Sequence, residues 1–105
     1  IEMDLRHRLE FSHYIPVLVN VQYKSVVDLV VGQYRPDVVV HAAAYKHVPM
    51  MEGNPWEAVF NNVIGSWNVM EAAVAHGVDR FVMVSTDKAV RPANVMGASK
   101  RVCEL

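Results

Sequence analysis

Short apolar runs alternate with helix-length segments along this chain, and the alternation limits its fold more strongly than any other feature of the sequence. The apolar runs, which are typical of buried strands, cover residues 15–21, 37–41 and 80–85. The segments with helical periodicity cover 26–34, about 55–76 and the residues from about 96. Strands that alternate with helices in this way predict an α/β domain with a parallel sheet.

Terminal signals mark the predicted helices. Ser25 is placed to cap the helix over 26–34. Asn54-Pro55 combines an N-cap with proline at the first helical position, and Gly77 supplies the stop of this longer helix. The apolar side chains expected to form its buried stripe are Val59, Phe60, Val63, Ile64, Trp67, Met70 and Val74.

Two further segments carry weaker signals. Residues 1–11 place apolar side chains among charges, which is consistent with the later turns of an amphipathic helix. The segment from Ala42 to Glu52 has no clean period and contains Pro49, so we expect a loop. Because this loop is longer than most strand-to-helix connections, it is a candidate functional segment.

Composition excludes several classes of function. The 105 residues amount to one small domain, and an apolar fraction of 52% is enough for a core. A net charge of −1 gives no indication of a nucleic-acid or membrane-surface partner, and no apolar run approaches the length of a membrane span. The single Cys103 fits a reducing compartment, so we expect a cytoplasmic protein. The five histidines fall on different predicted elements, so no metal site is expected.

The most informative motif follows the last apolar run. The sequence STDK, residues 85–88, places hydroxyls, a carboxylate and an amine directly after a predicted strand, and MGASK, residues 96–100, follows seven residues later. Crevices in open parallel sheets lie at the carboxyl ends of the strands, so these side chains are placed to meet a ligand. Lys100 follows Met96 by four residues, on the same face of the predicted helix.

These motifs resemble the short-chain dehydrogenase/reductase superfamily and, more narrowly, the nucleotide-sugar 4,6-dehydratases of the bacterial polysaccharide-biosynthesis type. Residues 35–49 resemble the fourth strand of these enzymes and its following loop, residues 62–69 resemble their long fourth helix, and residues 85–100 match the catalytic strand end and helix. The resemblance implies a three-layer, Rossmann-like α/β fold with a short parallel sheet. Residues 1–105 would then be a partial NAD(P)-binding domain, truncated on its N-terminal side.

The resemblance also implies a reaction on UDP-N-acetylglucosamine, in which hydride passes from C4 to NAD(P)⁺, water leaves across C5–C6, and hydride returns to C6. Thr86 matches the hydroxyl that hydrogen-bonds the sugar oxygen being oxidised. Lys88 matches the base that takes the C5 proton, and Asp87 matches the acid that protonates the leaving C6 hydroxyl. Lys100 matches the lysine that holds the nicotinamide ribose. From residue type alone, Asp87 and Lys88 would form a surface ion pair.

Met96 occupies the position at which the superfamily has a catalytic tyrosine. A thioether cannot exchange a proton, so the group that accepts the proton of the C4 hydroxyl is left open. Asp87, Lys88 and Lys100 are candidates, and the sequence does not choose among them. A branch that the chain resembles, the large membrane-anchored dehydratases, also carries methionine at this position.

Other candidate contacts are implied by the same resemblance. The candidate cofactor contacts, for NAD or NADP, are Asn20, Ala42, Ala43, Ala44 and Lys100. The candidate substrate contacts are Tyr45, Lys46, His47 and Asn62. Asn62 is also a candidate to hold the backbone of the catalytic strands or a water molecule.

No glycine-rich phosphate-binding turn occurs in these 105 residues, because the five glycines are scattered. We therefore expect the chain alone to bind dinucleotide weakly and to be inactive. The strand over 15–21 would lack its native neighbours, so it pairs with 37–41, pairs with another chain or stays poorly held. An exposed apolar edge favours association, which predicts a homo-oligomer or a strand-exchanged dimer.

Two other functions compete with dehydration. The chain could be a non-catalytic oligomerising or protein-binding module that keeps the motif by descent. It could also resemble an epimerase or reductase, but these enzymes do not need the elimination acid and base that Asp87 and Lys88 match.

Overall fold

The computed structural model describes residues 13–105 of the chain. Within them, two parallel strands form the sheet, β1 (Val38–His41) and β2 (Arg80–Met83). The strands pair from Val38 opposite Arg80 to His41 opposite Met83. The predicted α/β fold with a parallel sheet is confirmed.

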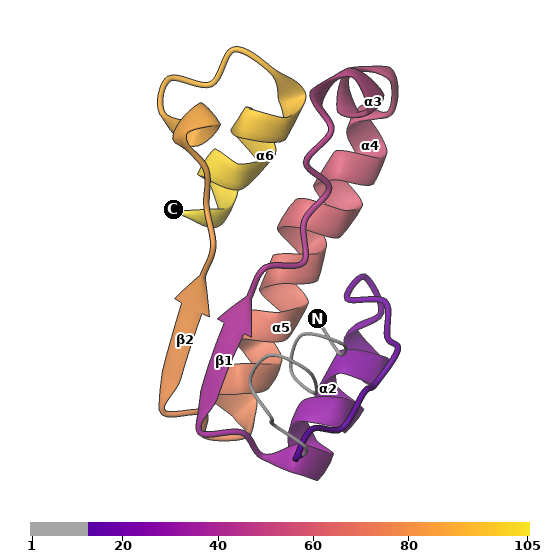
Figure 1. Ribbon diagram of the computed structural model, residues 1–105, viewed down its shortest axis with the longest axis vertical. Coiled ribbons are helices and arrows are strands. Elements are labelled where there is room, and N and C mark those ends of the chain that lie inside the picture. Colours follow the sequence, from indigo (N-terminus) through magenta and orange to yellow (C-terminus); the bar gives the residue numbers. More distant parts are fainter. Residues whose placement is uncertain (1–12) are drawn as a thin grey trace.

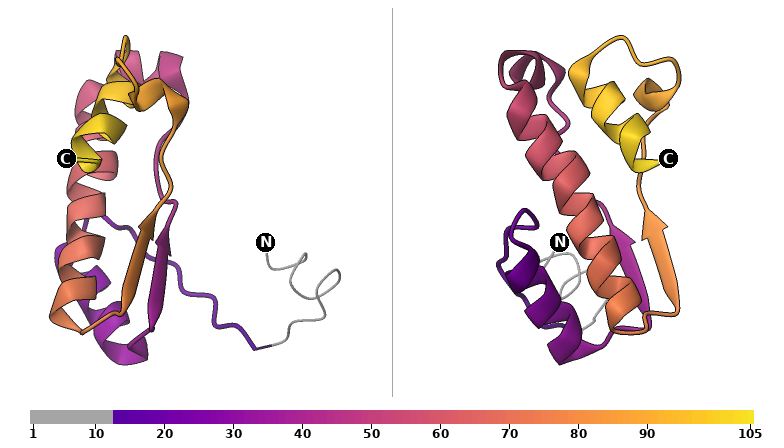
Figure 2. Two further views of the ribbon diagram at one scale, coloured as in Figure 1. Left: turned by 90° about the vertical axis from the view of Figure 1, so that its left-hand side faces the viewer. Right: turned by 180° about the vertical axis from the view of Figure 1, so that it is seen from behind.

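Helices make up most of the remaining structure. They are α2 (Lys24–Tyr34), α3 (Val48–Gly53), α4 (Pro55–Ala58), the π-helix η1 (Val59–Ile64), α5 (Gly65–Ala75), the 3₁₀ helix η2 (Asp87–Ala89) and α6 (Val95–Cys103). Figure 1 shows α4, η1 and α5 as one continuous helix, which is the long helix predicted from the sequence. In Figure 2, α2, α5 and α6 lie on one side of the sheet, and no helix of the described residues covers the other side.

The predicted cap of α2 is wrong, whereas the predicted N-cap position of the long helix, with proline in its first turn, is confirmed. α2 begins at Lys24 with Tyr23 at its N-cap position, so Ser25 lies inside the first turn. Asn54 occupies the N-cap position of α4 without a capping side-chain bond. Its Nδ2 donates instead to the carbonyl of Met50, 2.9 Å away in α3, because α3 ends directly before α4 begins.

The strand predicted over 15–21 is also wrong. Residues 13–20 have no regular secondary structure and do not join the sheet, so the direct pairing with β1 is not formed. Figure 2 shows this segment leading away from the strands. An apolar run becomes a strand only where a neighbouring strand bonds its backbone. Among the described residues this segment has no such neighbour, and its side chains Ile15 and Leu18 are exposed. The helical turns predicted over 1–11 lie outside the described residues.

The loop predicted from Ala42 to Glu52 contains α3. Pro49 lies in the first turn of this helix, where the missing amide hydrogen is not needed, so it starts the helix rather than preventing one. α3 and α4 both pack against α6. The buried apolar cluster among these helices consists of Met51, Ala58 and Met96.

The long helix buries a different face from the predicted one. Most of the predicted apolar stripe faces solvent, with Trp67 55% and Val74 77% exposed. The buried side chains are small or polar: Asn61, Asn62, Gly65, Ser66, Asn68, Val69, Ala72 and Ala73. Small side chains allow close packing, and a Cβ at Gly65 would lie 2.7 Å from Cγ2 of Val21. A hydrophobicity pattern does not reveal such a face, because it assigns asparagine to the surface. Here the asparagine side chains are buried because hydrogen bonds inside the chain satisfy their amides.

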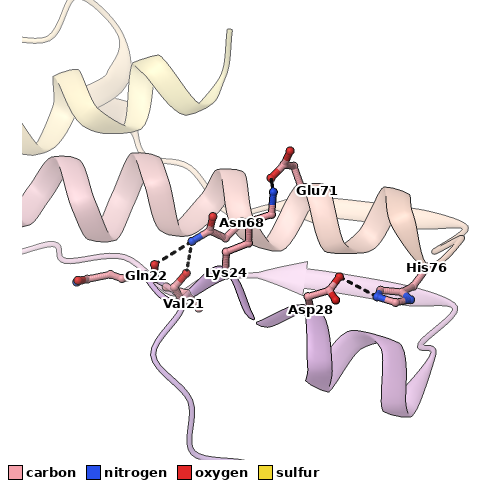
Figure 3. A network of polar contacts seen from close by, with 7 residues as sticks. All are labelled: Val21, Gln22, Lys24, Asp28, Asn68, Glu71 and His76. Atoms are coloured by element: carbon pink, nitrogen blue, oxygen red, sulfur yellow. Dashed lines mark hydrogen bonds and ion pairs between the residues drawn. The ribbon is translucent and has the colours of Figure 1, made fainter. Parts of the chain in front are cut away.

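Polar contacts hold α2 and the residues before it against α5 (Figure 3). Asn68 Nδ2 donates to the carbonyls of Val21, at 2.9 Å, and Gln22, at 3.1 Å. The two ion pairs between the helices are Lys24–Glu71 at 2.8 Å and Asp28–His76 at 2.9 Å. The apolar core beneath them consists of Val27, Val31, Val69 and Ala72.

Candidate functional site

A cavity of about 310 Å³ lies at the carboxyl ends of β1 and β2. The residues selected from the sequence that line it are Ala42, Ala44, Tyr45, Lys46, Thr86, Lys88, Met96 and Lys100. Val84 and Ser85 complete the lining. The segments after the two strands and the helix α6 meet here because parallel strands bring their carboxyl ends to one edge of the sheet.

Five other selected residues, including Asn62, which is described below, do not line this cavity. Ala43 is exposed between two alanines that do line it. Asn20 lies before α2, where its Oδ1 accepts the amide hydrogen of Gln22 at 2.9 Å. His47 lines a separate hollow next to α3. The side chain of Asp87 is 90% exposed.

Lys100 is the buried charge of the site. It is 4% exposed, and its Nζ donates to the carbonyl of Val84 at 2.6 Å, just beyond the end of β2. Met96 precedes it by one helical turn and is also 4% exposed, packed in the cluster between α6 and α3. One face of α6 therefore brings a thioether and an amine to the cavity wall.

A tight turn presents the other polar groups. Thr86 Oγ1 accepts the amide hydrogen of Lys88 at 3.3 Å and donates to Oδ1 of Asp87 at 3.1 Å. The Nζ of Lys88 lies 3.6 Å from the same carboxylate oxygen. The hydrogen bond from Thr86, followed by the charge of Lys88, lowers the pKa of Asp87. The carboxyl group is therefore ionised at neutral pH.

The tight turn of residues 86–88 packs against the N-terminal end of α6. A Cβ at Gly97 would lie 2.2 Å from the carbonyl oxygen of Lys88, so only glycine allows this approach. Asn94 Oδ1 accepts the amide hydrogen of Gly97 at 2.7 Å, and Glu52 Oε1 accepts that of Val95 at 2.6 Å. These bonds satisfy free amides of the helix N-terminus. The role of Glu52 had no signal in the sequence, because it comes from α3.

Asn62 ties three elements together behind the cavity. It is fully buried; its Oδ1 accepts the amide hydrogen of Tyr45 at 2.8 Å, and its Nδ2 donates to the Tyr45 carbonyl at 3.1 Å and to Ser99 Oγ at 2.9 Å. Every polar group of its side chain is used inside the chain. This arrangement matches the backbone-holding alternative for Asn62 and leaves it no contact with the cavity.

A second buried chain of hydrogen bonds runs from β1 to the long helix. His41 Nε2 lies 2.9 Å from Ser66 Oγ, which donates to the carbonyl of Asn62 at 2.5 Å. Burial, followed by the charge of Lys100, lowers the pKa of His41. No local pattern indicates the contact between His41 and Ser66, because the two residues are 25 positions apart. Ser66 does follow Asn62 by four residues, which places both on one face of the helix.

The described residues contain no group of histidine, cysteine, aspartate and glutamate side chains that could hold a metal ion. Among the same residues, no helix has both the length and the apolar character needed to cross a membrane. The cavity therefore offers amines, hydroxyls and small side chains as its chemical groups.

The arrangement can be compared with known proteins. The family described as Polysaccharide biosynthesis protein matches residues 1–105. The chain belongs to this polysaccharide biosynthesis protein family. The family member is similar to the capsular polysaccharide biosynthesis protein CapD of Staphylococcus aureus, with 52% identity over 99 residues, which is 94% of this chain and 16% of that protein.

Two further proteins are similar to this family member. It is 50% identical over 82 residues to a UDP-glucose 4-epimerase of Rickettsia canadensis, covering 78% of this chain and 23% of the epimerase. The crystal structure of dTDP-4-dehydrorhamnose reductase from Bacillus anthracis in complex with NADP superposes with a TM-score of 0.79 and 31% identity, covering 93% of this chain and 40% of that one. The fold is therefore Rossmann-like, and the chain spans less than a quarter of the two curated relatives.

Proposed function

We propose that this chain is the part of an NAD(P)-dependent nucleotide-sugar 4,6-dehydratase that carries its proton-transfer groups, acting on UDP-N-acetylglucosamine in bacterial surface polysaccharide biosynthesis. The observation that carries the proposal is the single cavity that joins Thr86, Lys88 and Lys100 at the carboxyl ends of two parallel strands. Membership of the polysaccharide biosynthesis family supports it. The site lies where open α/β sheets bind ligands.

The residues of the cavity suit a dinucleotide and a sugar. Ala42 and Ala44 present small side chains where a cofactor must approach the backbone, and Lys100 provides an amine for its ribose. When bound, the nicotinamide accepts hydride from C4 of the sugar and returns it to C6. Thr86 donates or accepts a hydrogen bond at the C4 oxygen while this occurs.

Elimination of water needs a base and an acid at neighbouring carbons. For this, the proton on the charged amine of Lys88 passes to the neighbouring carboxylate of Asp87, the neutral amine takes the C5 proton, and the Asp87 carboxyl protonates the hydroxyl that leaves C6. Lys88 returns its proton to C5 when hydride reaches C6. Asp87 is ionised in the free chain, so it must gain a proton when the substrate covers it. Removal of water from a carboxyl group raises its pKa, which favours that protonation.

A graft tests the proposal. This chain replaces the matching 99 residues of the Staphylococcus aureus relative, and the hybrid and its parent are incubated with UDP-N-acetylglucosamine and NAD⁺. We expect the 4-keto-6-deoxy product, recognised by the loss of one water in mass spectrometry, and we expect D87N and K88M to abolish it. A hybrid that makes no such product, beside a parent that does, would contradict the proposal.

A 4-epimerase is the second candidate, because the Rickettsia relative carries that name. Epimerisation inverts C4 without loss of water, so its product has the mass of the substrate and is recognised by NMR of the same incubation, whereas dehydration is recognised by product mass. An epimerase would also tolerate D87N, since no hydroxyl leaves. A hybrid with neither activity would favour a non-catalytic, protein-binding module.

The chain alone is expected to bind NAD⁺ too weakly for detection in the micromolar range. Pyrophosphate affinity in these folds comes from a glycine-rich turn and the following helix N-terminus, and the glycines of this chain form no such turn. Isothermal calorimetry of the 105-residue chain checks this expectation. Micromolar binding would contradict it and would show that residues 42–44 and Lys100 hold the dinucleotide without a glycine-rich turn.

A further inference from the structure

The cavity contains one phenol, and it comes from the loop after β1. Tyr45 lines the cavity together with Met96, Thr86 and Lys100. Met96 is almost fully buried in an apolar cluster, and a thioether cannot accept a proton. The lining therefore carries its phenol at position 45 and not at position 96, beside the amines of Lys88 and Lys100.

The backbone of Tyr45 is held rigidly. The side chain of Asn62 bonds both its amide hydrogen, at 2.8 Å, and its carbonyl oxygen, at 3.1 Å. The side-chain amide of Asn62 also donates to Ser99 Oγ on α6, the helix that carries Lys100. The clamp therefore fixes the loop relative to α6, and because it holds Tyr45 only by its main-chain atoms, none of these bonds uses the phenol. Supported groups of this kind suit catalysis, because proton transfer needs a fixed donor–acceptor distance.

The charges around the ring favour an oxyanion on a ligand. Lys46, Lys88 and Lys100 line the same cavity, and no described residue of its lining carries a carboxylate. Asp87, the ion-pair partner of Lys88, has a side chain that is 90% exposed, and Glu104 interacts with Lys100 from outside the lining. Positive charges close to a hydroxyl stabilise the negative charge that develops as it loses its proton. The site is thus arranged for removal of a proton from a ligand hydroxyl.

We infer that Tyr45 is the proton acceptor for the sugar hydroxyl that is oxidised, in place of the residue at position 96; the inference rests on the proposed function. As its phenolate, Tyr45 takes the O4 proton while the C4 hydride passes to the oxidised nicotinamide, and the C4–O4 bond becomes a carbonyl. The resulting phenol releases its proton to solvent, and Asp87 recovers from solvent the proton that it gives to the leaving hydroxyl.

Y45F in the hybrid protein is the first test. General acid–base groups contribute about 10²–10⁴-fold to rate, so we expect kcat to fall by at least about 100-fold with a small change in KM. Circular dichroism should be unchanged, because phenylalanine keeps the ring and the main-chain bonds to Asn62. Y34F is the matched control: Tyr34 has the same exposed fraction, 43%, and lies at the end of α2, outside the cavity. Its kcat should equal that of the parent hybrid.

Nitration of tyrosine by tetranitromethane gives a readout that needs no turnover. The hybrid is treated with and without millimolar UDP-N-acetylglucosamine and NAD⁺, and each tyrosine peptide is quantified by mass spectrometry. We expect the two ligands to protect Tyr45 several-fold and to leave Tyr34 unchanged. Protection of both tyrosines, or of neither, contradicts a place for Tyr45 at the site.

The outcomes separate this inference from the proposed function. Dehydration by the hybrid that Y45F leaves intact overturns the role of Tyr45 while the dehydratase assignment stands. Protection of Tyr45 without any dehydration contradicts the dehydratase assignment and supports Tyr45 as a group of the binding site. No protection and no dehydration overturn both.

Discussion

Burial divides the charged side chains near the cavity into two kinds. Lys100 is enclosed and bonded to the carbonyl of Val84, so its amine has one fixed position. Asp87 lies almost wholly in water, where Thr86 and then Lys88 keep its pKa low. The buried amine is preorganised, whereas the exposed carboxylate needs a ligand to change its protonation. Under the proposed function, binding of the substrate would therefore complete the pair of Asp87 and Lys88.

His41 should give the folded chain a sensitivity to acid. Its pKa is lowered by burial and then by the charge of Lys100, whereas an unfolded histidine titrates at about 6.5. The unfolded state therefore binds more protons once the pH falls below about 6.5, and the stability that neutral His41 contributes is lost as the pH falls through its folded-state pKa.

Urea denaturation between about pH 7 and pH 5 measures this loss. We expect the midpoint to fall with pH in the unmodified chain and to fall less in H41Q, whose amide can still donate to Ser66. H47Q is the control, because His47 is exposed and should leave the slope unchanged. Equal slopes for H41Q and the unmodified chain would show that another group sets the pH dependence.

At the scale of the elements, Gly97 is expected to set the distance between the turn of residues 86–89 and α6. Alanine would place a Cβ 2.2 Å from the Lys88 carbonyl, so G97A should destabilise the fold by about 1–3 kcal/mol and move the backbone of residues 86–89. G53A is the matched control, since nothing lies within 4 Å of a Cβ at Gly53.

Chemical denaturation and amide shifts in ¹H–¹⁵N spectra check this prediction. G53A should change the unfolding free energy by less than about 1 kcal/mol, in the stabilising direction, because alanine has the higher helix propensity. If G97A leaves the amide shifts of the turn unchanged, the close contact does not position Lys88.

The parts of the structure that follow from local signals were predictable from the sequence. The paired strands and the polar residues after the second of them, such as Thr86, follow from apolar runs and from their place at a strand end, whereas Ala42 was selected only through the family resemblance. The buried face of the long helix was not predictable, because Asn62 and Ser66 are buried through bonds to residues far away in sequence. The strand over 15–21 failed for a related reason, since strand formation depends on a neighbour that no local pattern specifies.

At the scale of the whole molecule, no helix of the described residues covers one side of the sheet. Val38, Val40, Val82 and Val84 are exposed, and the sheet of the described residues has two strands, each with an unpaired outer edge. Parallel sheets are normally covered on both faces, and isolated strand pairs are only marginally stable in water. We therefore expect the chain to associate in solution.

Sedimentation velocity measures this association. The unmodified chain should sediment as a dimer or larger species, and V40K, which places a charge on β1, should shift it toward the monomer. V74K provides the control, because Val74 is exposed on α5, away from the sheet. A monomeric unmodified chain would contradict the expectation, and dissociation by V74K rather than V40K would locate the contact on the helices.

The π-helical segment η1 makes the number of residues in the long helix as important as their identity. An α-helix turns through about 100° per residue, and each π turn holds more residues than an α turn. Removing one residue between Val59 and Ile64 would restore the tighter α winding, and the missing residue would offset the change, so α4 and α5 would keep nearly the same rotation relative to each other. The side chains inside the segment would change face, so a single-codon deletion would turn Asn62 away from its partners and undo the clamp on the loop without altering any side chain that lines the cavity.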